Sequence, residues 1–158
     1  MNTANQRTDD VPRISRILVA TDFSDQASHA LEWARSLAAV FGAKLVLLHV
    51  IDIFSLAEMT CVTGGSEDLL EILREQAHKH MGGLKALIPD AETFVREASP
   101  RTVIVEVALE LNCQLIVLGT HGRAGLAHLL LGSVAEYVVR HSKVPVLTVR
   151  MHGTKTQS

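Results

Sequence analysis

The chain has few aromatic residues and no excess of basic ones. Only 4% of its 158 residues are Phe, Trp or Tyr, which argues against a surface that stacks nucleic-acid bases. Its 15 Lys and Arg residues do not outnumber its 17 Asp and Glu residues, whereas duplex-binding proteins usually carry a basic excess. Both shortages disfavour nucleic acid as the main partner.

Long hydrophobic runs and paired cysteines are also missing. The longest apolar runs have the length of strands, which argues against a transmembrane helix and a membrane partner. The polar first residues contain no apolar segment of the kind found in secretory signals. Cys61 and Cys113 lie far apart and in no CxxC pairing, so we expect neither a disulfide framework nor a structural zinc site. A cytoplasmic location fits this pattern.

Short apolar runs alternate with helical patterns along the chain. Strands are predicted at residues 16–21, 44–50, 93–98, 114–118 and 144–150, most of them nearly all apolar, as in parallel sheets buried on both faces. Helices are predicted between them, at residues 24–41, 66–84, 99–111 and 133–141. Residues 51–65 are expected to form a loop, and Gly82-Gly83 to end or bend the second helix.

This alternation predicts an α/β fold, a single doubly wound five-stranded parallel sheet with helices on both faces. Residues 14–150 would form the domain, residues 1–13 a flexible N-terminal tail and residues 151–158 a C-terminal tail. Such sheets bind ligands beyond the carboxyl ends of their strands, at a switch in strand order. Polar or glycine-rich turns follow the first and fourth strands. If both turns contribute to one site, the first and fourth strands should be neighbours. This favours strand order 3-2-1-4-5 over 2-1-3-4-5.

The turn after the fourth strand carries the clearest chemical signal. Its residues Gly119, Gly122 and Gly132 allow backbone N–H groups to approach an anion without obstruction by a Cβ atom. Ser133 stands at the start of the next predicted helix, where free N–H groups favour a phosphate. The turn lacks the lysine of a Walker A loop and the glycine spacing of a dinucleotide fingerprint. From glycine content alone, a plain surface turn with Ser133 as N-cap is an equally good interpretation.

The spacing Gly119-x2-Gly122-x9-Gly132-Ser133 resembles the ATP-binding branch of the universal stress protein family. The segments around it, LIVLGTHGRAG, LLGSVAEYVV and VPVLTV, resemble that family too, as do ILVATDFS and LVLLHVID near the start. The likeness covers about residues 16–150 and is weak between residues 53 and 100. It departs from the family at Glu97-Ala98, where members often carry a glycine.

The resemblance implies a Rossmann-like fold, of the adenine nucleotide alpha hydrolase type, that binds ATP, AMP or another adenine nucleotide, with or without Mg²⁺. The carboxylate of Asp22 would accept hydrogen bonds from ribose or adenine, and the backbone of Val50 would meet the adenine. The residues that match the phosphate and ribose cradle are Gly119, Gly122, Gly132, Ser133 and Val134, with Ala20 and Thr21 lining its floor.

Simpler interpretations exist for several of these residues. Asp22 can be an acid that stabilises the start of a helix, and Val50 a core residue. Thr120, His121 and Arg123 share the glycine-rich turn, where His121 or Arg123 could contact a phosphate or be an ordinary surface residue. No residue is assigned a catalytic or metal-binding role. His78 and His80 are two apart on a predicted helix and point to different faces, which argues against a shared metal ion.

The favoured function is an ATP-binding stress or regulatory module that acts as a homodimer, in which nucleotide orders residues 119–133 and protein partners read the change. Residues 144–149 would pair across the dimer, because they form an edge strand and Pro145 suits an edge. One alternative is a slow ATPase or nucleotidyl-transfer enzyme of related fold. The other is a stress protein that binds no nucleotide and acts through protein contacts. Any hydrolysis would be slow, since no general base is assigned and the turn holds no lysine.

Overall fold

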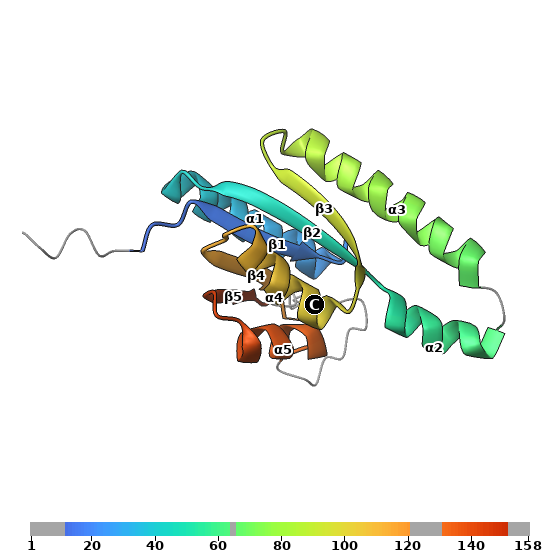
Figure 1. The fold of residues 1–158 in the computed structure, drawn as a ribbon. Coiled ribbons are helices and arrows are strands. Elements are labelled where there is room, and N and C mark those ends of the chain that lie inside the picture. Colours follow the sequence, from blue (N-terminus) through green and yellow to red (C-terminus); the bar gives the residue numbers. More distant parts are fainter. Residues whose placement is uncertain (1–11, 64–65, 121–130, 152–158) are drawn as a thin grey trace, which may run out of the picture.

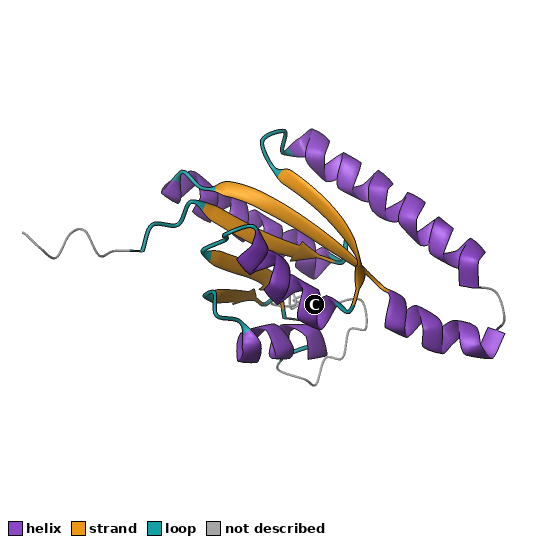
Figure 2. Ribbon diagram, in the orientation of Figure 1, coloured by secondary structure: helices purple, strands orange, loops and turns teal. Residues whose placement is uncertain are grey.

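Five parallel strands form a central sheet with helices on both faces (Figure 1, Figure 2). The computed structural model describes residues 12–63, 66–120 and 131–151. The spatial order of the strands is β3-β2-β1-β4-β5, which confirms the predicted order and makes β1 and β4 neighbours. In chain order the strands are β1 (Arg16–Thr21), β2 (Lys44–Asp52), β3 (Glu92–Ala98), β4 (Leu115–Gly119) and β5 (Val146–Val149).

Four of the helices described cover the two faces of the sheet. Helices α1 and α3 pack on one face, and α4 and α5 pack on the other (Figure 1). Helix α2 extends away from the sheet beyond the end of β2 (Figure 1). None of the helices in the described ranges is long and apolar enough to cross a bilayer. The helices are α1 (Asp25–Phe41), α2 (Ile53–Thr63), α3 (Ser66–Leu87), α4 (Pro100–Glu110) and α5 (Ser133–His141).

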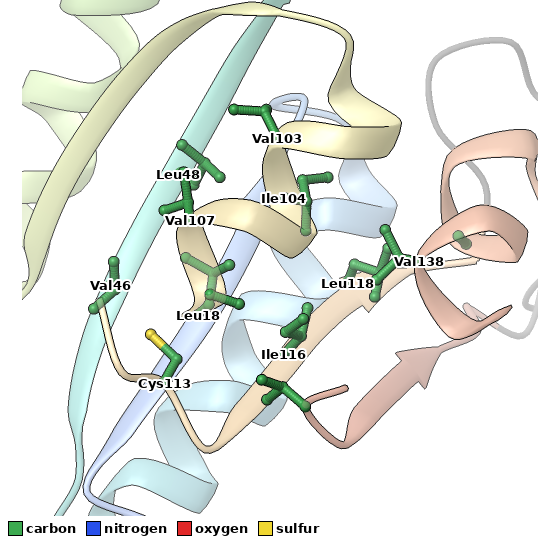
Figure 3. Close-up of a cluster of buried hydrophobic side chains, with 13 residues drawn as sticks. Leu18, Val46, Leu48, Val103, Ile104, Val107, Cys113, Ile116, Leu118 and Val138 are labelled. Atoms are coloured by element: carbon green, nitrogen blue, oxygen red, sulfur yellow. The ribbon is translucent and has the colours of Figure 1, made fainter. Parts of the chain in front are cut away.

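The alternating side chains of the central strands supply two separate cores. Ile17, Val19 and Leu47 are fully buried on the α1 and α3 side. Leu18 and Val46 are fully buried on the α4 and α5 side (Figure 3). Burial of one such side chain stabilises the fold by about 1.5–3 kcal/mol. Burial on both faces therefore explains why these strands read as continuous apolar runs.

Helix α1 begins and ends at the residues that the sequence predicts. The hydroxyl of Ser24 accepts a hydrogen bond from the N–H of Ala27 at 3.2 Å, as an N-cap does. Gly42 ends the helix in the left-handed conformation, with φ of 64°, and its N–H donates to the carbonyl of Ala38. The turn between β1 and α1 is thus fixed at its helical end.

Two expectations in the middle of the chain are wrong. Most of the predicted loop at residues 51–65 is helix α2, and the carboxylate of Asp52 caps its first turn by accepting from the N–H groups of Phe54 and Ser55 at 3.1 and 3.2 Å. Helix α3 continues through Gly82-Gly83 to Leu87. Two glycines inside a helix cost about 2 kcal/mol, and burial of the neighbouring Met81 offsets a cost of this size.

Candidate functional site

The turn between β1 and α1 is fixed by side-chain hydrogen bonds. The Oδ1 atom of Asp22 accepts from the N–H of Ser24 at 3.1 Å and from its hydroxyl at 2.6 Å. The hydroxyl of Thr21 accepts from the N–H of Phe23 at 3.1 Å. Asp22 therefore does support the start of the helix, as the simpler interpretation holds. The two bonds from Ser24 also fix the orientation of this carboxylate.

Phe23 has an unusual backbone conformation in this turn. Its φ of 63° lies in the left-handed region, which residues with a Cβ atom adopt uncommonly. Its ring packs on His49 of β2, with centroids 4.3 Å apart, and on His80 of α3, at 4.8 Å. The Nδ1–H of His49 donates to the carbonyl of Thr21 at 2.8 Å. These contacts join the turn, β2 and α3, and strain held in this way is frequent at functional sites.

A pocket of about 530 Å³ lies at the carboxyl ends of β1 and β2. Pockets that hold small molecules enclose roughly 300–1,000 Å³, so this one has room for such a ligand. Two residues singled out from separate parts of the sequence, Asp22 and Val50, both line it. The other lining residues are Phe23, His49, Ile51, Asp52, Ser55, Leu56, Leu73, Gln76, Ala77, His80 and Pro100.

The turn after β4 is described at its two ends. Thr120 is buried, and its N–H donates to the carbonyl of Val149 at 3.0 Å. The N–H of Gly132 donates to the carbonyl of Thr120, which brings the two ends of the turn together. Gly132 is the N-cap of α5 and Ser133 its first residue. The interpretation of Ser133 as N-cap is therefore wrong by one position.

Gly119 makes a close contact with another helix. A Cβ atom at this position would lie 3.3 Å from the carbonyl carbon and oxygen of Gln26, in the first turn of α1. The absence of a side chain therefore allows the end of β4 to pack directly on the backbone of α1. The sequence alone does not reveal this contact.

Two further predicted site residues, Ala20 and Val134, lie on the same face of the sheet as Val50. Ala20 of β1, Val50 of β2 and Val134 of α5 are all partly buried against the cluster beneath α4 and α5. Together with Asp22, they gather residues of three different segments at the carboxyl ends of the strands. His121, Gly122 and Arg123 fall outside the described residues.

Helices α2 and α3 form a wall of the pocket that the sequence argument did not include. Leu73, Gln76, Ala77 and His80 follow the spacing i, i+3, i+4, i+7, which places them on one face of α3. In the sequence, this spacing and the helix-capping residue Asp52 are the features that could have revealed the wall. His80 lines the pocket and His78 does not, although both are exposed, in agreement with the prediction that they point to different faces. No group of three or more metal-binding side chains occurs among the described residues.

An ion pair fixes α3 against the end of β3. The guanidinium of Arg74 donates to both carboxylate oxygens of Glu97, at 2.7 and 2.9 Å. This hydrogen bonding lowers the pKa of Glu97, and the same carboxylate raises the pKa of Arg74. The departure from the family pattern at Glu97 thus supplies a partner for the pocket helix.

Cys113 is a poor candidate for chemistry. Its side chain is buried in the core beneath α4 (Figure 3). Burial raises the pKa of the Cys113 thiol, an effect that nearby Arg16 opposes in part. Because the thiolate is the nucleophilic form, this thiol is a weak nucleophile.

Comparison with known proteins adds evidence that the geometry alone does not give. Residues 13–150 match the profile described as the universal stress protein family. The chain is 32% identical over 139 residues to universal stress protein MJ0531 of Methanocaldococcus jannaschii, covering 85% of this chain and 81% of that one. It is 33% identical over 148 residues to universal stress protein YxiE of Bacillus subtilis, covering 86% and 99%.

Solved structures agree with these relatives. The hypothetical protein MJ0577 of Methanocaldococcus jannaschii superposes with a TM-score of 0.81 and 29% identity, covering 90% of this chain and all (100%) of that one. A universal stress protein described as a complex with cAMP superposes with a TM-score of 0.56 and 29% identity, covering 88% and 98%.

Proposed function

Because the chain belongs to the universal stress protein family, we propose that it binds an adenine nucleotide, ATP foremost, beyond the carboxyl ends of β1, β2 and β4. One observation carries this proposal. Asp22 and Val50 come from separate segments that the sequence resemblance assigns to one ligand, and they line one pocket. The relative described as a complex with cAMP supports adenine nucleotides as the ligand class.

The base and ribose take the part of the pocket beside β1 and β2. The carboxylate of Asp22, oriented by Ser24, accepts hydrogen bonds from ribose hydroxyls. The backbone of Val50, at the end of β2, contacts the base. Ala20 and Thr21 form the floor beneath them, next to the hydrogen bond between Thr21 and His49.

The phosphates extend toward the turn between β4 and α5. The first N–H groups of α5 have no partner within their own helix, and the helix dipole adds partial positive charge there. Gly132, at the N-cap, presents no side chain to an approaching phosphate, and Ser133 follows it with a hydroxyl. In this proposal Gly119, Thr120, Gly122 and Val134 complete the cradle, and His121 and Arg123 contact the phosphates. Mg²⁺ accompanies a bound triphosphate.

The protein acts as a homodimer that pairs through β5. The sheet has two edges, β3 and β5, and the two strands differ in charge. Strand β3 (ETFVREA) carries charged side chains, which discourage pairing with another strand. Strand β5 (VLTV) carries none. Of the two edges, β5 is the one suited to a second copy of the chain.

The nucleotide acts as a regulatory ligand rather than as a substrate for hydrolysis. Bound nucleotide orders residues 119–133, and protein partners read the ordered form. The turn at residues 119–133 contains no lysine, and no residue is assigned as a general base, so any hydrolysis is slow.

Calorimetric titration of nucleotide-stripped protein with ATP tests the proposal, with and without Mg²⁺, followed by AMP and cAMP. Two variants locate the site. Asp22→Asn keeps an acceptor for Ser24 but removes the charge, and should weaken ATP binding about tenfold. Gly132→Val should abolish binding, because its side chain occupies the phosphate position. The backbone of Gly132, with φ of −70° and ψ of 159°, is one that valine adopts readily, and thermal unfolding of the variant checks that the fold survives.

Glu58→Gln is the matched control for the loss of one carboxylate. Glu58 is exposed on α2 and does not line the pocket. The proposal fails if the wild-type protein binds no adenine nucleotide at millimolar concentration, or if both site variants bind ATP as tightly as wild type.

A further inference from the structure

Helix α3 presents two polar side chains to the pocket. Gln76 and His80 are four residues apart, one helical turn, and alternate with the apolar Leu73 and Ala77 on the same face. Ala77 is 2% exposed and packs this face against the body of the protein. Gln76 and His80 are themselves exposed, so a ligand that enters the pocket can reach both side chains. The mixture of apolar and hydrogen-bonding groups suits a flat heterocycle that stacks and is read along its edge.

The position of this helix face is fixed on both sides. Arg74, two residues before Gln76, donates to both carboxylate oxygens of Glu97. Met81, the residue after His80, is buried, at 3% exposed. The imidazole of His80 packs on Phe23 at 4.8 Å. The unusual φ of Phe23 accompanies this contact. The imidazole of His80 is thus placed before a ligand arrives, which lowers the entropic cost of binding one.

We propose that Gln76 and His80 are the residues that select the base of the bound nucleotide, favouring adenine over guanine. This inference rests on the proposed function, since it places the base in the pocket. A glutamine amide donates and accepts side by side, which matches the N7 acceptor and N6 donor of adenine. Guanine offers two acceptors along the same edge, N7 and O6, and leaves the amide carbonyl without a donor. His80 adds an imidazole fixed at the same wall.

The test compares ATP with GTP and inosine triphosphate, which lacks the N6 amino group, in calorimetric titrations. Wild type should prefer ATP. Gln76→Ala and His80→Ala should each weaken ATP binding about tenfold while changing GTP binding less than about twofold. His78→Ala is the matched control, because His78 lies on the same helix, exposed and outside the pocket lining. It should leave both affinities unchanged.

A second measurement uses the wild-type chain and does not depend on a variant that folds. The imidazole resonances of His80 should shift on addition of ATP, and those of His78 should not. Unshifted His80 resonances at saturating ATP would overturn the inference.

The outcomes separate this inference from the proposed function. If wild type binds no nucleotide, the proposed function fails and the inference falls with it. If wild type binds ATP but the variants keep its affinity and preference, only the inference is wrong. An equal loss of ATP and GTP binding would also refute it, since α3 would then be a general wall of the pocket.

Discussion

Substitution of Gly119 by alanine separates the two explanations offered for this glycine. If its purpose is to let a phosphate approach, an alanine harms nucleotide binding and leaves the empty protein unaffected. The structure instead places Gly119 against Gln26, where an added Cβ atom meets backbone at 3.3 Å. That distance is shorter than ordinary van der Waals contact. The atoms it meets belong to the first turn of α1 and cannot rotate away as a side chain would.

The expected loss of stability follows from two opposing effects. Overpacking a tight interior position costs about 1–3 kcal/mol. Replacing glycine with alanine lowers the conformational entropy of the unfolded chain, which stabilises the folded state by about 0.4–1 kcal/mol. The net loss for Gly119→Ala is therefore about 1.5 kcal/mol in the free energy of unfolding. In a chain of this size, that loss lowers Tm by about 3–6 °C.

The assay is chemical and thermal unfolding of nucleotide-free protein. The protein concentration is kept fixed, because association between copies would shift the midpoints of both unfolding transitions. Gly83→Ala is the matched control. It makes the same chemical change inside α3, where an added Cβ atom has no neighbour within 4 Å. This control should raise stability by about 0.5–1 kcal/mol, since alanine favours helix over glycine. The two substitutions therefore shift Tm in opposite directions.

A Gly119→Ala protein as stable as wild type without nucleotide would refute the packing argument. If that variant also bound ATP more weakly, the ligand explanation would replace it.

Two further predictions concern the first turn and the free edge of the sheet. Ser24→Ala removes the N-cap of α1 and a hydroxyl donor to Asp22, so stability should fall by about 1 kcal/mol. ATP binding should weaken as well, and calorimetry showing full affinity would mean that Ser24 does not orient the carboxylate. In light scattering, wild type should have the mass of a dimer and Thr148→Lys, which places a charge on β5, that of a monomer. A wild-type monomer at every concentration would contradict pairing through β5.

Much of the fold could be predicted because its signals are local. The strand at Ile17 to Val19 is buried on both faces, and its apolar run is visible without any knowledge of its neighbours. Ser24 and Gly42 mark the two ends of α1 through their own hydrogen bonds and backbone angles. The strand order followed from the two polar turns, which only neighbouring strands can bring to one site.

Helix α2 escaped prediction because it lacks the signal used to find helices. Its apolar residues do not gather on one face, so the sequence IFSLAEMTCVT shows no helical period. The glycines at 82 and 83 misled in the opposite way. They predict a break from composition, while the buried Ala77 and Met81 hold the helix through contacts that the local sequence does not reveal.

The candidate site also contains residues that the sequence predicts and residues that it does not. Asp22 and Val50 stand directly after or within predicted strands, so topology alone brings them together. Gln76 and His80 reach the pocket because α3 packs against a turn about fifty residues earlier in the chain. No local pattern encodes that approach. The contact of Gly119 with Gln26 likewise depends on how β4 and α1 pack.

The strand order also has a consequence for how the chain is made. Strand β1 lies in the middle of the sheet, between β2, which follows soon after it, and β4, which is synthesised in the last third of the chain. While the ribosome is still producing the residues before Leu115, β1 has one paired edge and one open edge. The core beneath α4 and α5 then lacks its C-terminal half. A nascent chain in this state exposes apolar surface and an unpaired strand, the features that invite aggregation and chaperone binding. Completion of β4 closes that edge, and only then can the ends of β1 and β4 form one site.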